Sequence, residues 1–323
     1  MTVTVASPLR DELFRNGYVV VPDVIDPTTV IKPVLEEYAR VLDELAADLA
    51  AQGQISSTYA HLPFEARLIQ IAKESGSTHT QHFDVTLPQN NIRADTPIHL
   101  GDAVFKLLTC PSVLDIVEQI LGPEISVNPV QHVRLKLPAH ALGDDPDPMM
   151  GKSPWHQDGA VVLEEADETE ILTVWIPLGE ANEENGCMRV IPTDRSAELA
   201  NHCPSPVKGA HIPDAQVDQA AGVTLPMSAG SILLLHTRTV HDSLPNRTAD
   251  RLRVSLDLRY QPTGQPSGRE QFPSFVVRSE TYPERVTTEP TDWRNGWLEA
   301  RSRLAQDEVP TFNRWDPNSP LCA

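Results

Sequence analysis

The residues of this chain best suited to metal chemistry begin in SPWHQDGAVV, residues 153–162, where His156 and Asp158 stand two positions apart. On a β-strand, side chains at i and i+2 point to one face, so we expect His156 and Asp158 to project together while Gln157 faces away. An imidazole and a carboxylate are two of the three ligands in the 2-His-1-carboxylate arrangement that leaves open positions on Fe(II). The pair alone is a weak signal, because the chain has 11 histidines and a second His-x-Asp at residues 82–84.

A third ligand has to come from a distant segment, and His241 is the strongest candidate. It falls in LLLHTRTVHDSLPNRTADRLRVSLDLRYQP, where Ser243 and Arg253 follow it. His236 is the rival for this role. It ends the apolar run SILLL and lies five residues further from Arg253 along the chain than His241 does. We therefore interpret His236 as a core or pocket-wall histidine.

The stretch RVSLDLRY, residues 253–260, alternates polar with apolar side chains. This period of two predicts a strand with one polar and one apolar face. The polar face, which includes Arg253, could be exposed to solvent, or it could equally line the wet interior of a barrel whose apolar outer face is covered by the N-terminal helices. The planar guanidinium of Arg253 suits a bidentate contact with a carboxylate.

Polar residues on VQHVRLKLP, residues 130–138, leave two interpretations open. Arg134 and Lys136 could meet an anionic substrate or the keto-acid end of a cosubstrate, and Gln131 and His132 are comparable candidates if the other face points inward. A half-exposed strand with alternating polar residues explains the pattern equally well.

The segment HTQHFD, residues 79–84, offers His79, His82 and Asp84 as ligands of a separate metal site. The alternative is a loop that lines the entrance to the substrate pocket. Directly before His156, the acidic and proline-rich loop GDDPDPMMGK, residues 143–152, suggests a mobile lid.

We expect one domain over residues 1–323, with a mainly helical part at 1–124, a β-barrel core at 125–262 and a C-terminal extension at 263–323. Residues 26–53 predict a long helix with Asp26 as N-cap and Pro27 at its first position. Shorter helices are expected at 64–76, 111–122 and 292–306. Loop 182–186, NEENG, reads as a hairpin between two strands.

We expect the five tryptophans to have different roles in the β core and in the C-terminal extension. Trp155 and Trp175 suit packing or substrate contact equally, whereas we expect Trp293, Trp297 and Trp315 to pin the C-terminal helix.

Charge and composition narrow the class of partner. The net charge of −19 argues against nucleic acid and anionic membranes, so an anionic ligand needs locally placed Arg or Lys. No apolar run approaches the length of a membrane span, and four scattered cysteines without a C-x-x-C pair favour free thiols in a reducing cytosol. These features predict a cytoplasmic protein that acts on a small molecule, with a homodimer as one open alternative. The cysteines are Cys110, Cys187, Cys203 and Cys322.

WHQDG, LTVWIPLGEANEENGCMRVIP and HDSLPNRTADRLRVSLDLRYQ together resemble the phytanoyl-CoA dioxygenase family of Fe(II)/2-oxoglutarate oxygenases, over roughly residues 8–262. The resemblance implies a mainly β fold with peripheral helices around a double-stranded β-helix, the cupin-like jelly roll. It also implies that Arg253 holds the distal carboxylate of 2-oxoglutarate, that Ser243 assists it and that Trp175 lines the cosubstrate pocket. The implied iron ligands are His156, Asp158 and His241.

The expected function is a dioxygenase that uses Fe(II), 2-oxoglutarate and O2 to hydroxylate a small organic metabolite, releasing succinate and CO2. Asp158 is present where halogenating relatives carry a small residue, which favours oxidation. Desaturation, epoxidation or cyclisation at the same iron are alternatives, as is a catalytically silent barrel that binds a ligand. A hydrolytic metal enzyme would leave Arg253 unexplained.

Overall fold

The computed structural model describes residues 7–141, 153–205, 209–306 and 312–322. Its centre is an antiparallel sheet in the order β1-β9-β4-β11-β2-β12, with β3 also paired to β11. The strands of this sheet are β1 (Tyr18–Val21), β2 (Ile125–Val127), β3 (His132–Lys136), β4 (Leu172–Pro177), β9 (Ile232–His236), β11 (Arg253–Pro262) and β12 (Phe275–Arg278).

A second antiparallel sheet has the order β10-β5-β8, and β6 pairs with β7 apart from both sheets. Trp175 and Leu233 of the large sheet pack with Met188 and Val190 of the small one, so a hydrophobic cluster joins the two sheets. The architecture confirms the predicted jelly-roll core. The further strands are β5 (Met188–Ile191), β6 (Cys203–Ser205), β7 (Gly209–His211), β8 (Val223–Leu225) and β10 (Val240–Ser243).

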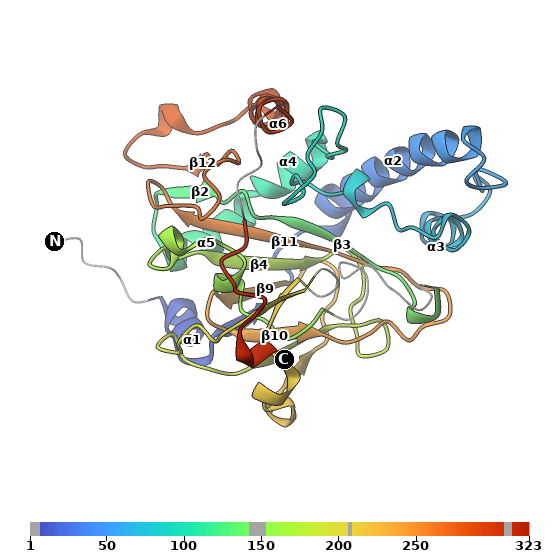
Figure 1. Cartoon of the computed structure of the whole chain (residues 1–323). Helices are drawn as coiled ribbons and strands as arrows, with labels where there is room; N and C mark the ends of the chain where they lie inside the picture. The colour runs from blue at the N-terminus through green and yellow to red at the C-terminus, as the bar shows by residue number, and fades with distance from the viewer. Residues whose placement is uncertain (1–6, 142–152, 206–208, 307–311, 323) are drawn as a thin grey trace.

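Helices cover the outer face of the large sheet, and β10 lies on its other side (Figure 1). They are α1 (Pro8–Asn16), α2 (Lys32–Ala51), α3 (Phe64–Ser75), α4 (Asp102–Leu108), α5 (Pro111–Leu121) and α6 (Pro290–Leu304). The predicted N-cap is confirmed, because the carboxylate of Asp26 accepts the backbone amides of Thr28 and Thr29 at 2.8 and 2.9 Å. A π-helical turn, Pro27–Ile31, then leads into α2.

The two faces of β11 separate as its alternating pattern predicts. Val254, Leu256, Leu258 and Tyr260 join the hydrophobic core beneath the helices. The opposite face turns toward the space between the sheets, where Arg253 is only 3% exposed. A polar strand face buried in this way has to be satisfied by other polar groups or by a ligand.

The predicted hairpin at residues 182–186 is wrong. β4 pairs with β9 and β11, whereas β5 pairs with β10 and β8, so this loop carries the chain from the large sheet to the small one. A turn-forming sequence fixes local geometry only, and in a jelly roll consecutive strands often belong to opposite sheets.

The tryptophans of the C-terminal part have two different roles. Trp293 and Trp297 are buried on α6, where their rings lie 5.7 and 5.4 Å from those of Phe105 and Phe272, as expected. Trp315 does not pin this helix. Its indole N–H donates to the carbonyl of Ala160 at 2.9 Å, so it holds the last segment of the chain beside the His156 region.

The expectation of free thiols is wrong for two of the four cysteines. Cys203 and Cys322 form a disulfide across a separation of 119 residues, while Cys110 and Cys187 are free and buried. Only the tertiary fold brings residues this far apart together, so spacing along the chain carried no signal for the pair. None of the helices in the described parts of the chain is long and apolar enough to cross a membrane.

We expect the unreduced, denatured protein to react with a thiol reagent at two cysteines per chain, and at four after reduction. Replacing Cys322 with serine should lower the free energy of unfolding by about 2–4 kcal/mol, because the unfolded chain loses a long-range cross-link. Chemical denaturation measures this change, and reduced wild type is the matched control. Four reactive thiols in the unreduced protein would contradict the pairing.

Candidate active site

Three side chains able to hold a metal ion meet between the sheets. One ligand atom from each of His156, Asp158 and His241 lies within 4.8 Å of the others, and the described residues contain no second such group. The Nε2 atoms of both histidines are 4.0 Å from Oδ1 of Asp158. The structure therefore brings together the three residues that the sequence singled out.

The backbone around these residues explains how they converge. His156 forms an isolated antiparallel β-bridge with His241 of β10, which places the two rings 4.2 Å apart. The extended conformation lasts through Gln157, and Asp158 begins a 3-10 turn, Asp158–Ala160, rather than continuing a strand. Gln157 faces away as expected, since its amide group donates to the carbonyls of Glu198 and Arg238.

Both histidines present a free Nε2 to the centre of the group. Nδ1 of His156 lies 2.8 Å from the carbonyl of Pro154, and Nδ1 of His241 lies 2.9 Å from that of Thr239. A carbonyl only accepts, so each Nδ1 donates, and this bond directs each Nε2 toward the centre of the group. Burial and the adjacent His241 lower the pKa of His156 to about 3, which keeps that imidazole neutral.

Asp158 is held as a carboxylate. The hydroxyl of Thr173 donates to Oδ2 at 2.5 Å, and Nη2 of Arg259 donates to Oδ1 at 2.5 Å. Burial alone would raise the pKa of Asp158, but Arg259, the two histidines and Thr173 together hold it well below its ordinary value. Two imidazoles and one carboxylate are the donor set that fits a divalent first-row metal.

A second polar centre lies around Arg253. Its Nη1 donates to Ser255 at 2.6 Å, its guanidinium carbon lies 5.4 Å from the ring centroid of Trp175, and its Nε has no hydrogen-bond partner. Within the described residues Arg253 forms no ion pair. Burial lowers the pKa of Arg253 to about 10, so it is still a cation at neutral pH. A buried, unpaired guanidinium is a site prepared for an anion.

Lys136 lies opposite Arg253 in the register of β3 and β11. Its Nζ donates to the hydroxyl of Ser243 at 2.5 Å and to the carbonyl of Leu244 at 2.6 Å. Burial, with Arg253 close by, lowers the pKa of Lys136 well below its ordinary value. A carboxylate bound beside these two residues would favour the charged form of Lys136.

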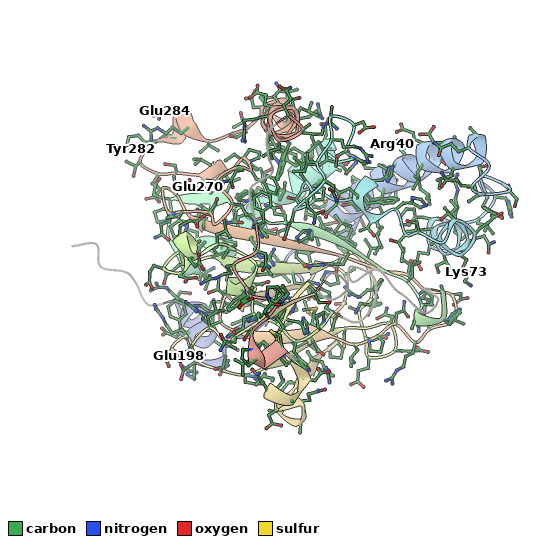
Figure 2. The ribbon with its side chains drawn as sticks, in the orientation of Figure 1. Arg40, Lys73, Glu198, Glu270, Tyr282 and Glu284 are labelled. Carbon is green, nitrogen blue, oxygen red and sulfur yellow. A yellow bond between two sulfur atoms is a disulfide. The ribbon has the colours of Figure 1, made fainter. Side chains whose placement is uncertain are left out.

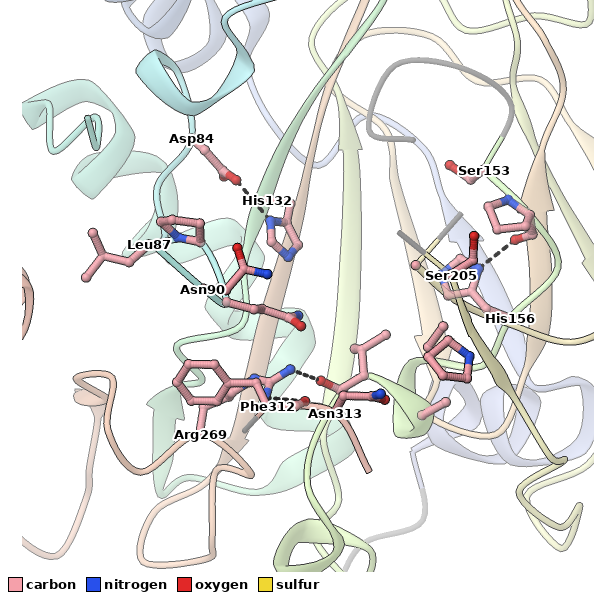
Figure 3. A pocket seen from close by; sticks show the side chains of 18 of the residues that line it. Asp84, Leu87, Asn90, His132, Ser153, His156, Ser205, Arg269, Phe312 and Asn313 are labelled. Carbon is pink, nitrogen blue, oxygen red and sulfur yellow. Dashed lines mark hydrogen bonds and ion pairs between the residues drawn. The ribbon is translucent and has the colours of Figure 1, made fainter. Parts of the chain in front are cut away.

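A narrow cavity joins the two centres. His156, Asp158 and His241 line it together with Trp175 and Arg253. An outer cavity of about 670 Å³ opens beyond it, with His156 in its wall (Figure 3). Arg134 and Arg259 line this cavity too. The site therefore has one compartment that contains the three ligands and reaches Arg253, and a larger one that His156 lines as well.

The comparisons with known proteins identify the family. The sequence model of the phytanoyl-CoA dioxygenase (PhyH) family matches residues 13–254. The chain belongs to the phytanoyl-CoA dioxygenase family. It is an Fe(II)- and 2-oxoglutarate-dependent dioxygenase, with O2 as its second cosubstrate.

Two curated relatives show sequence similarity to this PhyH-family chain. The probable alpha-ketoglutarate-dependent hypophosphite dioxygenase of Stutzerimonas stutzeri is 26% identical over 230 residues, which cover 68% of this chain and 69% of that protein. The 1-deoxypentalenic acid 11-beta-hydroxylase of Streptomyces exfoliatus is 27% identical over 168 residues, which cover 49% of this chain and 56% of the hydroxylase.

A solved structure shares the fold of the PhyH-family chain. The non-heme monooxygenase ThoJ matches with a TM-score of 0.60 at 17% identity, and the match covers 92% of this chain and 97% of ThoJ.

Three residues that the sequence nominated line neither cavity of this PhyH-family enzyme. His236 packs edge-on against Phe14, 6.2 Å away, and does not join the ligand group. The amide group of Gln131 donates to the carbonyl of Asn128 at 2.7 Å, and Gln131 lines neither of the two cavities. Ser243 is the acceptor of Lys136 rather than a cavity-lining residue.

The separate metal site proposed for residues 79–84 does not form among the described residues. Nε2 of His79 lies 2.9 Å from the hydroxyl of Ser75, while Asp84 turns away from both histidines and contacts His132. Asp84 lines the outer cavity, as the alternative expectation had it. The suggested lid at 143–152 falls outside the described residues.

Thr173 and Arg259 are functional candidates that the sequence analysis missed. Arg259 belongs to the polar face of β11, so its alternating pattern was the available signal. Thr173 sits in the fully buried strand β4, and nothing in LTVWIP distinguished it from a packing residue.

Proposed function

We propose that this dioxygenase hydroxylates a small organic metabolite, with His156, Asp158 and His241 as the ligands of Fe(II). We further propose that Arg253 binds the distal carboxylate of 2-oxoglutarate. One observation carries both assignments, because the narrow cavity connects the three donors to a buried guanidinium that has no carboxylate partner among the described residues. The catalytic unit on this proposal is a single domain over residues 1–323.

The chain's own residues bind, orient and protect the reactants. Bound iron supplies the redox chemistry that couples the oxidation of 2-oxoglutarate to succinate and CO2 with the hydroxylation of the substrate. The carbonyls of Pro154 and Thr239 orient the two imidazoles, and Thr173 and Arg259 fix the carboxylate of Asp158. Such hydrogen bonds behind metal ligands commonly change metal affinity or activity by 10- to 100-fold.

Arg253, Lys136 and Ser243 form the cosubstrate end of the site on this proposal. Arg253 offers a planar fork to the carboxylate, and Trp175 packs against its guanidinium. Lys136 adds a second donor from the neighbouring strand, and Ser243 orients it.

Hydroxylation is the outcome that needs the fewest additional groups, since desaturation, epoxidation and cyclisation each require a suitably placed second position on the substrate. The name of the Streptomyces exfoliatus relative states a hydroxylation, and the names of both curated relatives state an acidic substrate. These names support the proposal at the level of reaction class.

The test is succinate formation from 2-oxoglutarate by wild type with Fe(II) and ascorbate in air. We expect slow turnover without added substrate, which stops when iron is chelated and returns with Fe(II) but not with Zn(II). A folded, iron-loaded enzyme that releases no succinate above the protein-free rate would count against the proposal.

A further inference from the structure

We propose that the substrate of this enzyme is a carboxylic acid with a partly apolar skeleton, and that Arg134 binds its carboxylate. This inference rests on the proposed function and extends it to the class of substrate. It comes from the charge and the hydrogen bonding of the two connected cavities.

The cavities carry more positive than negative charge. The arginines that line them are Arg134, Arg253, Arg259 and Arg269, and the carboxylates are Asp84, Asp158 and Asp257. The charges of Fe(II) and of 2-oxoglutarate cancel, so their binding leaves one positive charge uncompensated among the described residues. In a protein with a net charge of −19, a positive interior indicates an anionic ligand.

Arg134 is the arginine that remains available to a ligand. Arg259 is bonded to Asp158 and to the carbonyl of Val130, and Arg269 donates to the carbonyls of Phe312 and Val161. Arg253 serves 2-oxoglutarate on the proposal above.

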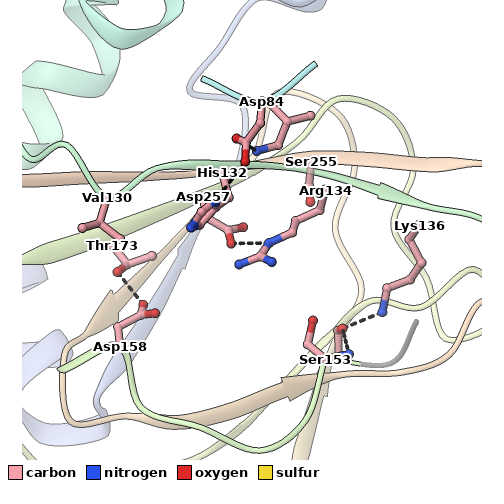
Figure 4. A network of polar contacts seen from close by, with 12 residues as sticks. Asp84, Val130, His132, Arg134, Lys136, Ser153, Asp158, Thr173, Ser255 and Asp257 are labelled. Carbon is pink, nitrogen blue, oxygen red and sulfur yellow. Dashed lines mark hydrogen bonds and ion pairs between the residues drawn. The ribbon is translucent and has the colours of Figure 1, made fainter. Parts of the chain in front are cut away.

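Among the described residues Arg134 donates only through its Nε, which forms an ion pair with Asp257 at 2.8 Å, and the end of its guanidinium points between Asp158 and Ser153 (Figure 4). Arg134 lines both cavities, so it stands where the outer cavity meets the metal site.

A second polar side chain on the same strand supports this assignment. His132 and Arg134 are two residues apart on β3 and line the same outer cavity. Oδ2 of Asp84 lies 3.0 Å from Nδ1 of His132, and Oδ1 accepts the backbone amides of Val85 and Val133. The carboxylate of Asp84 thus orients the imidazole, whose Nε2 is left to accept a hydrogen bond from a substrate donor near the carboxylate.

The rest of the outer cavity indicates the shape of the acid. Its volume of about 670 Å³ lies in the range of pockets for drug-sized ligands. Leu87, Val161 and Phe312 add apolar wall to this cavity. One available guanidinium matches a single carboxylate, whereas a phosphate ester carries nearly two charges and would call for more donors.

Binding of octanoate and octanamide, and of 4-phenylbutanoate and its amide, tests the proposal. Each probe is titrated by calorimetry, without oxygen, into enzyme loaded with Fe(II) and 2-oxoglutarate. We expect each acid to bind about 10- to 100-fold more tightly than its amide, as a charge-assisted hydrogen bond would give. The preference should vanish in Arg134→Met, return in part in Arg134→Lys, and persist in Arg40→Met, which removes an exposed arginine of α2 (Figure 2).

Each other outcome overturns the inference. Equal binding of acid and amide, no binding of either acid at millimolar concentration, or a preference that survives Arg134→Met would show that Arg134 does not recognise a substrate carboxylate. A loss of 2-oxoglutarate affinity greater than tenfold in Arg134→Met would assign this arginine to the cosubstrate instead. Failure of wild type to form the Fe(II)/2-oxoglutarate complex would overturn the proposed function itself.

Discussion

Replacing Asp158 with alanine is expected to lower Fe(II)-dependent succinate formation by at least about 100-fold, because its carboxylate is the one anionic donor in the proposed group of three ligands. The same change should abolish stoichiometric iron binding, which metal analysis of the desalted protein measures. Loss of turnover with full iron binding would contradict the assignment of Asp158 as a ligand.

This variant needs a control for folding, since Asp158 also neutralises the buried Arg259. An unpaired charge of this kind destabilises a protein by about 3–5 kcal/mol. His241→Ala removes a ligand without breaking an ion pair to Arg259, so it should lose iron and turnover while keeping more of the stability. Asp95→Ala, which removes a carboxylate 81% exposed at the surface, should behave as wild type.

Replacing Arg253 with alanine is expected to raise the KM for 2-oxoglutarate by about 10- to 100-fold, the usual effect of losing a charge-assisted hydrogen bond. Iron binding should persist, because Arg253 contacts none of the three ligands. The KM is obtained from succinate release at saturating Fe(II), and iron content is measured on the same samples.

Arg253→Lys separates charge from geometry. Lysine keeps the positive charge but lacks the planar fork, so we expect a loss of affinity smaller than that of the alanine variant. Arg40→Ala is the matched surface control. An unchanged KM in Arg253→Ala would show that the cosubstrate carboxylate binds elsewhere, with Lys136 as the next candidate.

The parts of this site that the sequence predicted are those fixed by local pattern and by order along the chain. His156 and Asp158 stand two positions apart along the chain, and the alternation of RVSLDLRY placed Arg253 on the polar face of β11. The resemblance to the PhyH family then linked these residues to His241. The capped helix at α2 was predictable for the same reason, since its signals lie within a few residues of each other.

The parts that were missed depend on contacts between distant segments. Thr173 donates to Asp158 because the fold brings β4 next to the turn after His156. Cys203 forms a disulfide with Cys322, which lies 119 residues further along the chain. The loop at 182–186 had the residues of a hairpin but joins opposite sheets. Trp315 was grouped with α6 by sequence proximity, whereas its partner is the carbonyl of Ala160. None of these pairings leaves a periodic or local trace in one sequence.

Titration of 2-oxoglutarate into Fe(II)-loaded wild type without oxygen tests the central claim most directly. Chelation of the iron by the keto acid produces a visible charge-transfer band, so the measurement requires neither the substrate nor turnover. We predict a saturable band in wild type, a much weaker apparent affinity in Arg253→Ala and no band in Asp158→Ala. A folded, iron-loaded wild type that shows no band would contradict the dioxygenase site and favour a barrel that only binds a ligand.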